Sequence, residues 1–214
     1  MAVNVRPVRL PLGPTGFARI SAVSRETLDR LAAYVDLLEQ WNRRINLVSA
    51  NTMGDVWRRH ILDCAQLMKH LPRNARVVVD LGSGAGLPGL VLAALGVPEM
   101  HLVESDHRKA AFLREAARVM DIEVTLHPER IEKMARFPAD AITARACAEL
   151  TQLIDYSEKF VSPYTVCLFL KGSNAEGEIA AAQKTWSLTA ETLPSVSDPT
   201  GKIVRLSAIK RATA

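Results

Sequence analysis

The chain has 214 residues, enough for one large domain or for one domain with an appendage, and its 48% hydrophobic and 23% charged residues are ordinary for a globular protein. No run of about 18 apolar residues occurs, so we expect no membrane-spanning helix and no membrane partner. The 3 cysteines form no C-x-x-C pair, which predicts neither a disulfide nor a metal site and favours the reducing cytoplasm.

The net charge of +4 is concentrated at the start of the chain. Residues 1–74 contain 11 Lys or Arg against 6 Asp or Glu, whereas residues 75–214 contain 16 against 17. The excess is densest at the arginine pairs 43–44 and 58–59. A solvated helical face explains either pair alone, but a polyanionic partner such as RNA explains the whole asymmetry at least as well.

The first predicted helix runs from Ser24 to Trp41, where apolar residues recur at helical spacing and Ser24 is the expected N-cap. A second helix is predicted from Asp55 to His70, before a break at "LPRNA". In residues 1–22, Arg and Pro interrupt every apolar run, which excludes a usual secretory signal and predicts a flexible terminus. We therefore expect a basic helical extension over residues 23–74.

From residue 76 onward, strand and helix patterns alternate, which predicts a parallel sheet covered on both faces. The predicted strands lie at 76–81, 100–105, 122–126, 140–144 and 164–172, and the predicted helices at 87–95, 106–120, 129–135, 149–160 and 174–184. Two further strands, 185–193 and 202–209, have no helix between them, so they must pair antiparallel. Residues 75–214 are thus expected to form a Rossmann-like α/β domain.

The stretch "VVVDLGSGAGLPG" at 77–89 places four glycines in eight positions after a buried strand. So many glycines lower stability unless a ligand or a tight turn needs them. One frame, Gly84-x-Gly86-x-x-Gly89, matches the dinucleotide fingerprint and would make the protein an NAD-dependent oxidoreductase. In that frame, however, the first glycine should follow the strand directly, and here Gly82 and Ser83 intervene.

A second frame, Asp80-x-Gly82-x-Gly84-x-Gly86, resembles the S-adenosylmethionine loop of class I methyltransferases. The helix N-terminus behind the loop would then receive the polar end of the ligand. Glu104 ends the second predicted strand, where a carboxylate either accepts both ribose hydroxyls or is a simple surface acid. A ribose contact serves NAD and S-adenosylmethionine equally, but the closing antiparallel strand resembles only the methyltransferases.

Five segments in this order closely resemble the RsmG/GidB family: "LLEQWNRRINLVS" at 37–49, "RHILD" at 59–63, "GSGAGLPG" at 82–89, "ARA" at 144–146 and "LKG" at 170–172. The resemblance covers roughly residues 25–210. It implies the class I S-adenosylmethionine-dependent methyltransferase fold, with a mostly parallel sheet, an antiparallel last strand and an N-terminal helical extension. It also implies transfer of a methyl group to N7 of a guanine in small-subunit (16S) ribosomal RNA, free or as ribonucleoprotein, by a cytoplasmic protein that we expect to be a monomer.

The expected site residues follow from the loop and from the resemblance. The expected cofactor contacts are Asp80, Gly82, Gly84, Gly86, Leu87, Glu104, Ile131, Glu132 and Arg145, the expected catalytic residues are His60, Arg145 and Lys171, and the expected RNA contacts are Arg43, Arg44, Asn46, Arg58, Arg59 and Arg130. We expect none of the four paired arginines to lie on the strand-edge side of the sheet. Two departures from the family pattern are Cys64 after "RHILD" and Cys147 in "ARACAEL".

Methylation at guanine N7 needs alignment rather than a general base, because N7 carries a lone pair and no proton. Arg145 and Lys171 follow the fourth and fifth strands, at the ligand-bearing edge, where they are either solvated charges or donors to RNA phosphate or guanine O6. His60 is either a packed side chain or part of the RNA-facing surface, and Asn46 is either a helix-end cap or an RNA contact. Cys147 is interpreted as a small core residue rather than a nucleophile.

One further alternative is a non-enzymatic RNA-binding module with a vestigial cofactor loop. The intact set of loop glycines, together with Asp80 and Glu104, argues against it.

Overall fold

The computed structural model describes residues 11–212, which form a seven-stranded sheet in the order β3-β2-β1-β4-β5-β7-β6. The strands are β1 (Val77–Leu81), β2 (Glu99–Val103), β3 (Thr125–His127), β4 (Ala141–Arg145), β5 (Val166–Lys171), β6 (Trp186–Pro194) and β7 (Lys202–Arg211). Strands β1 to β5 pair in parallel, and β7 runs antiparallel to both β5 and β6. The predicted sheet and its antiparallel closing pair are confirmed.

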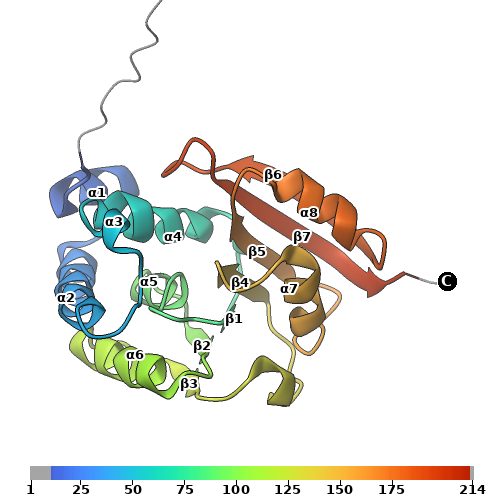
Figure 1. Ribbon diagram of the computed structural model, residues 1–214, viewed down its shortest axis with the longest axis horizontal. Coiled ribbons are helices and arrows are strands. Elements are labelled where there is room, and N and C mark those ends of the chain that lie inside the picture. Colours follow the sequence, from blue (N-terminus) through green and yellow to red (C-terminus); the bar gives the residue numbers. More distant parts are fainter. Residues whose placement is uncertain (1–10, 213–214) are drawn as a thin grey trace, which may run out of the picture.

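Helices cover both faces of this sheet (Figure 1). They are α1 (Pro14–Ser21), α2 (Arg25–Asn42), α3 (Ala50–Met53), α4 (Asp63–Ala65), α5 (Gly89–Ala94), α6 (His107–Val119), α7 (Leu150–Ser157) and α8 (Ala175–Ala182), with the short segments η1 (Trp57–Leu62), η2 (Gln66–Lys69) and η3 (Ile131–Lys133). Ser24 caps α2 as expected, since its side chain accepts a hydrogen bond from the Thr27 N–H. No helix in the described part of the chain is both long and apolar enough to cross a membrane.

Two N-terminal features differ from the prediction. Within residues 1–22, the described part contains helix α1, which begins at Pro14 and buries Phe17 against Trp57. The expectation of a flexible segment is therefore wrong for α1, and residues 1–10 lie outside the described residues. The helix predicted from Asp55 to His70 is three successive segments, of which the first, η1, is π-helical.

The strands divide the core into two hydrophobic clusters because their neighbouring residues point to opposite faces. Val78 and Leu168 belong to the cluster beneath α2, α5 and α6, whereas Val79 and Phe169 belong to the cluster beneath α7 and α8. Both clusters are apolar, which explains why residues 77–79 of β1 and 166–170 of β5 are continuous apolar runs rather than alternating ones.

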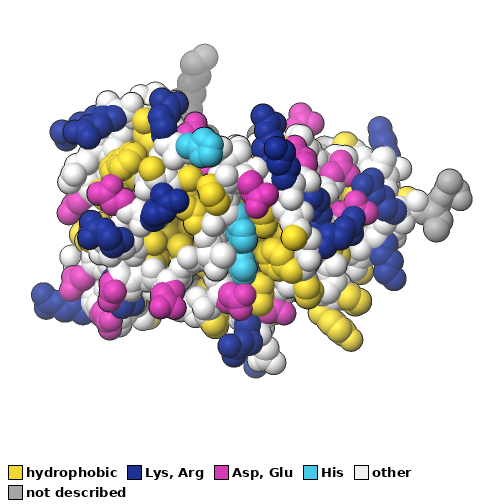
Figure 2. All heavy atoms as spheres, turned by 90° about the horizontal axis from the view of Figure 1, so that it is seen from below, with side chains coloured by type: hydrophobic (Ala, Val, Ile, Leu, Met, Phe, Trp, Pro, Cys, Tyr) yellow, Lys and Arg dark blue, Asp and Glu magenta, His cyan; other side chains and the backbone are white. Residues whose placement is uncertain are grey.

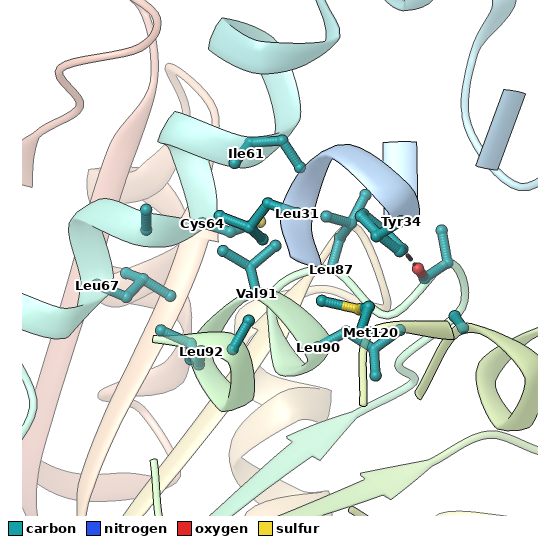
Figure 3. Close-up of a cluster of buried hydrophobic side chains, with 14 of the residues drawn as sticks. Leu31, Tyr34, Ile61, Cys64, Leu67, Leu87, Leu90, Val91, Leu92 and Met120 are labelled. Carbon is teal, nitrogen blue, oxygen red and sulfur yellow. Dashed lines mark hydrogen bonds between the residues drawn. The ribbon is translucent and has the colours of Figure 1, made fainter. Parts of the chain in front are cut away.

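The N-terminal helices are part of the first cluster rather than an appendage beside it. Leu31 of α2, Ile61 of η1 and Val91 of α5 are buried against one another (Figure 3). The buried Tyr34 hydroxyl donates a hydrogen bond of 2.7 Å to the Ala85 carbonyl, in the loop that follows β1. Helix α2 therefore holds the glycine-rich loop directly.

We expect Tyr34→Phe to lower the free energy of unfolding by about 1–3 kcal/mol, because the buried Ala85 carbonyl would lose its hydrogen bond from the tyrosine. Denaturant unfolding with an unchanged m-value would measure this loss. Tyr164→Phe is the matched control, since Tyr164 is 88% exposed and should change nothing. Equal midpoints for Tyr34→Phe and the unmodified protein would contradict the prediction.

Candidate active site

A cavity of about 510 Å³ opens at the carboxyl ends of β1, β2 and β4. Four segments form its wall: the glycine-rich loop at 82–85, the end of β2 at 103–105, the segment 129–132 and the segment 145–148. Such a site, beyond the carboxyl ends of parallel strands, is where ligands bind in open α/β sheets.

Asp80 lies beneath the loop, fully buried, rather than in the cavity wall. Its carboxylate accepts hydrogen bonds from Thr143 Oγ1 at 2.8 Å and from the Gly89 N–H at 3.2 Å. Burial raises the pKa of Asp80 to about 6. Asp80, expected among the cofactor contacts, therefore does not line the cavity, and its side chain supports the loop from beneath.

Gly86 is required by the packing of neighbouring side chains and does not line the cavity. It has a φ of +81°, and a Cβ there would lie 2.3 Å from Leu90 Cδ1 and 3.1 Å from Leu113 Cδ2. The glycine allows α5 to pack closely against α6, and it does not line the cavity as the loop motif suggested.

Gly82 and Gly84 do line the cavity, both with left-handed backbone, at φ +62° and φ +54°. A Cβ at Gly82 would lie only 2.3 Å from Cys147 Sγ. Cys147 is half-buried, and its thiol, with a pKa raised mainly by burial, forms part of the cavity wall at the edge of the core. The interpretation of Cys147 as a core residue alone is thus incomplete.

Glu104 is held in one orientation at the end of β2. Its Oε2 accepts a hydrogen bond from the Gly84 N–H at 2.9 Å, and its Oε1 accepts one from the Asp106 N–H at 2.7 Å. Each carboxylate oxygen has a further lone pair, so a ribose that presents two hydroxyls can still donate to it.

The opposite wall combines apolar and polar side chains. Leu87 and Ile131 are buried and line the cavity, as expected for contacts with a flat aromatic base. Glu132 receives a 3.4 Å hydrogen bond from the Tyr156 hydroxyl, and Lys159 binds the carbonyls of Glu132 and Met134. These bonds fix the segment 129–132 against the domain.

A second cavity of about 340 Å³ lies beside the first, and both are lined by Arg145 and Ala146. Arg145 Nη1 donates a hydrogen bond of 3.2 Å to the Arg59 carbonyl and lies 3.6 Å from Asp63 Oδ2. Lys171 Nζ lies 2.6 Å from Glu178 Oε2. The three side chains expected to be catalytic, Arg145, Lys171 and His60, all line this second cavity.

His60 is a neutral, buried histidine. The Thr52 hydroxyl donates to the Ser49 carbonyl, so at 2.7 Å it accepts from His60 Nε2–H and leaves Nδ1 as the unprotonated nitrogen. Within the described residues, Nδ1 has no hydrogen-bond partner. Burial and the nearby Arg145 and Arg59 lower the pKa of His60 to about 3, so the ring is uncharged at neutral pH.

The six expected RNA contacts do not share one surface. Arg43, Arg44 and Asn46 are exposed near the end of α2, whereas Arg130 is in the wall of the first cavity. Arg59 lines the second cavity, at the strand edge, and forms an ion pair with Asp198. The expectation that all four paired arginines lie away from that edge is therefore wrong.

The structure also settles two local questions among these residues: a partner of Arg58 and the residue that caps α2. Arg58 Nε lies 3.2 Å from Asp55 Oδ2. The C-cap of α2 is Arg43 rather than Asn46. The Asn42 side chain, at the end of α2, holds the turn that follows, because it accepts from the N–H groups of Leu47 and Val48. Sequence reasoning missed Asn42, because its partners lie five and six residues further along the chain.

Asp63 and Glu178 are the functional candidates that the sequence analysis did not single out. Both line the second cavity and lie against cations, Arg145 and Lys171. Only the position of Asp63 in "RHILD" hinted at such a role, since nothing local marks Glu178 among the acids of α8.

The sheet order and the cavity at its carboxyl edge define a class I methyltransferase fold. A putative O-methyltransferase from Klebsiella pneumoniae superposes with a TM-score of 0.60 at 14% identity, covering 92% of this chain and 97% of that one. A mutant of MtNAS in complex with S-adenosylmethionine superposes with a TM-score of 0.56 at 14% identity, covering 92% and 84%.

Sequence comparison identifies the family. The GidB model, rRNA small subunit methyltransferase G, matches residues 27–204. The ribosomal RNA small subunit methyltransferase G of Rhodospirillum centenum is 54% identical over 195 residues, covering 91% of this chain and 90% of that protein. The chain belongs to the GidB family, as the five sequence segments indicated.

We expect Gly84→Val to abolish binding of S-adenosylmethionine, the expected cofactor, while the protein stays folded. A β-branched side chain resists the φ of +54° and occupies space beside the cavity. Gly96→Val is the matched control, because Gly96 has a φ of +103°, has open space around it and lies outside the cavity. Calorimetry measures the affinity, and native affinity in a folded Gly84→Val variant would show that the loop is only a turn.

We expect Glu104→Ala to weaken S-adenosylmethionine binding about 10- to 150-fold, since hydrogen bonds to a charged acceptor contribute about 1.5–3 kcal/mol. Glu123→Ala, an exposed acid outside the cavity, should bind normally. A melting curve must accompany the titration, because Glu104 also holds the Gly84 and Asp106 N–H groups. Unchanged affinity would remove the ribose assignment.

Proposed function

We propose that this protein transfers a methyl group from S-adenosylmethionine to N7 of a guanine in 16S ribosomal RNA, in the cytoplasm. The observation that carries the proposal is a pair of neighbouring cavities that are both lined by Arg145. One cavity suits a nucleoside cofactor and the other suits a base. The chain that contains them belongs to a family of rRNA small subunit methyltransferases.

The residues of the first cavity fit S-adenosylmethionine. Glu104 would accept the ribose hydroxyls, and Leu87 and Ile131 would contact the adenine. Gly82 and Gly84 have a left-handed backbone that favours glycine, and as glycines they leave the side where the ligand approaches free of side chains. When bound, S-adenosylmethionine supplies a methyl group on a positively charged sulfur.

The second cavity fits a base that needs positioning and no deprotonation. Guanine N7 has no proton to lose, and His60, neutral and buried, is not required to remove one. Arg145 and Lys171 are held by neighbouring carbonyl and carboxylate groups, so they present fixed donors rather than mobile ones. The protein would therefore promote the reaction by aligning N7 of the base with the methyl group of the cofactor.

RNA phosphates would bind outside the cavities. Arg43 and Arg44 are exposed, and Leu47, three residues further, lines the first cavity, so this turn lies at its entrance. On the face shown in Figure 2, basic and acidic side chains of the described residues are intermixed, which is less suited to a polyanion. We propose that the protein acts as a monomer, on RNA either free or in a ribonucleoprotein particle.

The test is to map N7-methylguanosine in 16S ribosomal RNA from cells with and without the gene. The purified protein and S-adenosylmethionine should restore the missing methyl group on that RNA, offered naked and as assembled subunits. Identical RNA from both strains, with no transfer in vitro, would reject the proposal. Calorimetry with NAD separates the oxidoreductase alternative, since only one of the two cofactors should bind.

We expect the double variant Arg43→Gln, Arg44→Gln to bind RNA more weakly with unchanged S-adenosylmethionine affinity. The slope of its salt dependence should become shallower by about 0.7 for each phosphate of single-stranded RNA that the variant no longer neutralises. The double variant Arg114→Gln, Arg118→Gln removes the same charge from the exposed side of α6 and is the control. An unchanged salt slope in a folded Arg43, Arg44 variant would move the phosphate-binding surface elsewhere.

A further inference from the structure

Asp63, at the start of α4, lines the second cavity and has one carboxylate oxygen fully engaged and the other facing Arg145. Oδ1 accepts hydrogen bonds from Gln66 Nε2 at 3.0 Å, from Ser195 Oγ at 3.2 Å and from Ser197 Oγ. Oδ2 lies 3.6 Å from Arg145 Nη1, which is longer than a hydrogen bond. The three donors fix the orientation of the carboxylate and leave Oδ2 with free acceptor capacity.

Arg145 is fixed beside this acceptor at the junction of the two cavities. Its Nη1 donates to the Arg59 carbonyl, and its side chain is only 17% exposed, as is that of Asp63. A guanidinium has five N–H donors, so most remain available to a ligand. The structure thus places an oriented donor and an oriented acceptor side by side, next to the cofactor cavity.

Two of the three other cations that line the second cavity already have carboxylate partners. Lys171 pairs with Glu178 at 2.6 Å, and Arg59 pairs with Asp198. A phosphate would have to compete with these carboxylates, whereas an uncharged base with both donors and acceptors would not. Lys202 also lines the cavity and forms no ion pair with a described residue. At Arg59 and Lys171, however, the existing ion pairs favour a base over a phosphate.

We propose that Asp63 and Arg145 select guanine as the target base, with Arg145 donating to O6 and Asp63 Oδ2 accepting from N1–H. This inference rests on the proposed function, since N7 and O6 share one edge of guanine and N7 must face the first cavity. Adenine carries an amine donor in place of O6 and a lone pair in place of N1–H. With adenine, the 6-amino group would face the N–H donors of Arg145, and the lone pair on N1 would face the carboxylate oxygen of Asp63, so neither hydrogen bond could form.

The carboxylate also favours the reaction itself. Alkylation at N7 gives the base a positive charge, and a carboxylate hydrogen-bonded to N1–H stabilises that charge as it develops. Asp63 would therefore contribute to the rate of transfer as well as to the choice of base.

The test combines Asp63→Asn with base analogues placed at the methylated nucleotide of a short 16S RNA fragment. The three donors at Oδ1 would hold the amide oxygen of the asparagine, so its NH₂ group would replace Oδ2 and turn an acceptor into a donor. Inosine lacks only the 2-amino group of guanine, whereas 2,6-diaminopurine differs only at O6 and N1–H.

We expect the unmodified protein to methylate inosine within a few-fold of guanine and 2,6-diaminopurine at least about tenfold more slowly. Asp63→Asn should lose at least about tenfold on guanine and inosine, and its preference over 2,6-diaminopurine should shrink or reverse. Its S-adenosylmethionine affinity and melting temperature should stay near those of the unmodified protein. Asp155→Asn, the same change on the exposed side of α7, should behave like the unmodified protein.

Each contrary outcome has one meaning. If the unmodified protein transfers no methyl group to guanine N7, the proposed function fails. If it does, and Asp63→Asn methylates guanine at the normal rate or loses equally on all three bases, the selection by Asp63 is refuted. If Asp63→Asn does not fold, the analogues alone decide: 2,6-diaminopurine methylated by the unmodified protein as fast as guanine would mean that O6 and N1–H are not read, and would refute the proposal.

Discussion

The buried carboxylate of Asp80 ties together the sheet, the glycine-rich loop and helix α5. Burying a carboxylate is costly, and the raised pKa of about 6 reflects that cost. The hydrogen bonds from Thr143 on β4 and from the Gly89 N–H offset it. The hydrogen bond from Gly89 forms because α5 approaches closely: a Cβ at Gly89 would lie 2.8 Å from Asp80 Oδ2 and 2.3 Å from Leu102 Cδ2. The contact between Asp80 and the start of α5 therefore requires both the carboxylate and the absence of a side chain at Gly89.

Strand β4 carries both a residue that holds Asp80 and a residue that lines the two cavities. Thr143 and Arg145 are two residues apart, so their side chains leave β4 on the same face. Thr143 holds Asp80 beneath the loop, and Arg145 reaches the junction of the two cavities. A shift of β4 along its neighbours would therefore move the loop support and the guanidinium together. Both cavities are therefore built on the end of the same strand.

Local patterns predicted the sheet because each strand is an apolar run that ends at a turn, and they predicted the cavity because its glycines follow a strand. They did not show why each position is constrained: Asp80 and Gly86 are required by packing, although the loop motif suggested ligand contacts. Asp63 was missed because its role depends on Ser195 and Ser197, which lie 132 and 134 residues away in sequence. The same β6–β7 turn supplies the Asp198 partner of Arg59, so no local pattern could place that arginine at the strand edge.

Two groups of cations near the cavities differ in their physical roles. Arg43 and Arg44 are exposed and form no ion pair with any described residue, so contact with phosphate would release counterions without breaking an existing interaction. Arg59, Arg145 and Lys171 each lie against a carboxylate in a partly enclosed cavity, where a second anion gains little. Affinity for a polyanion and choice of a base therefore belong to different residues. A change in the first group should act on RNA of any sequence, whereas a change in the second should act according to the base that is offered.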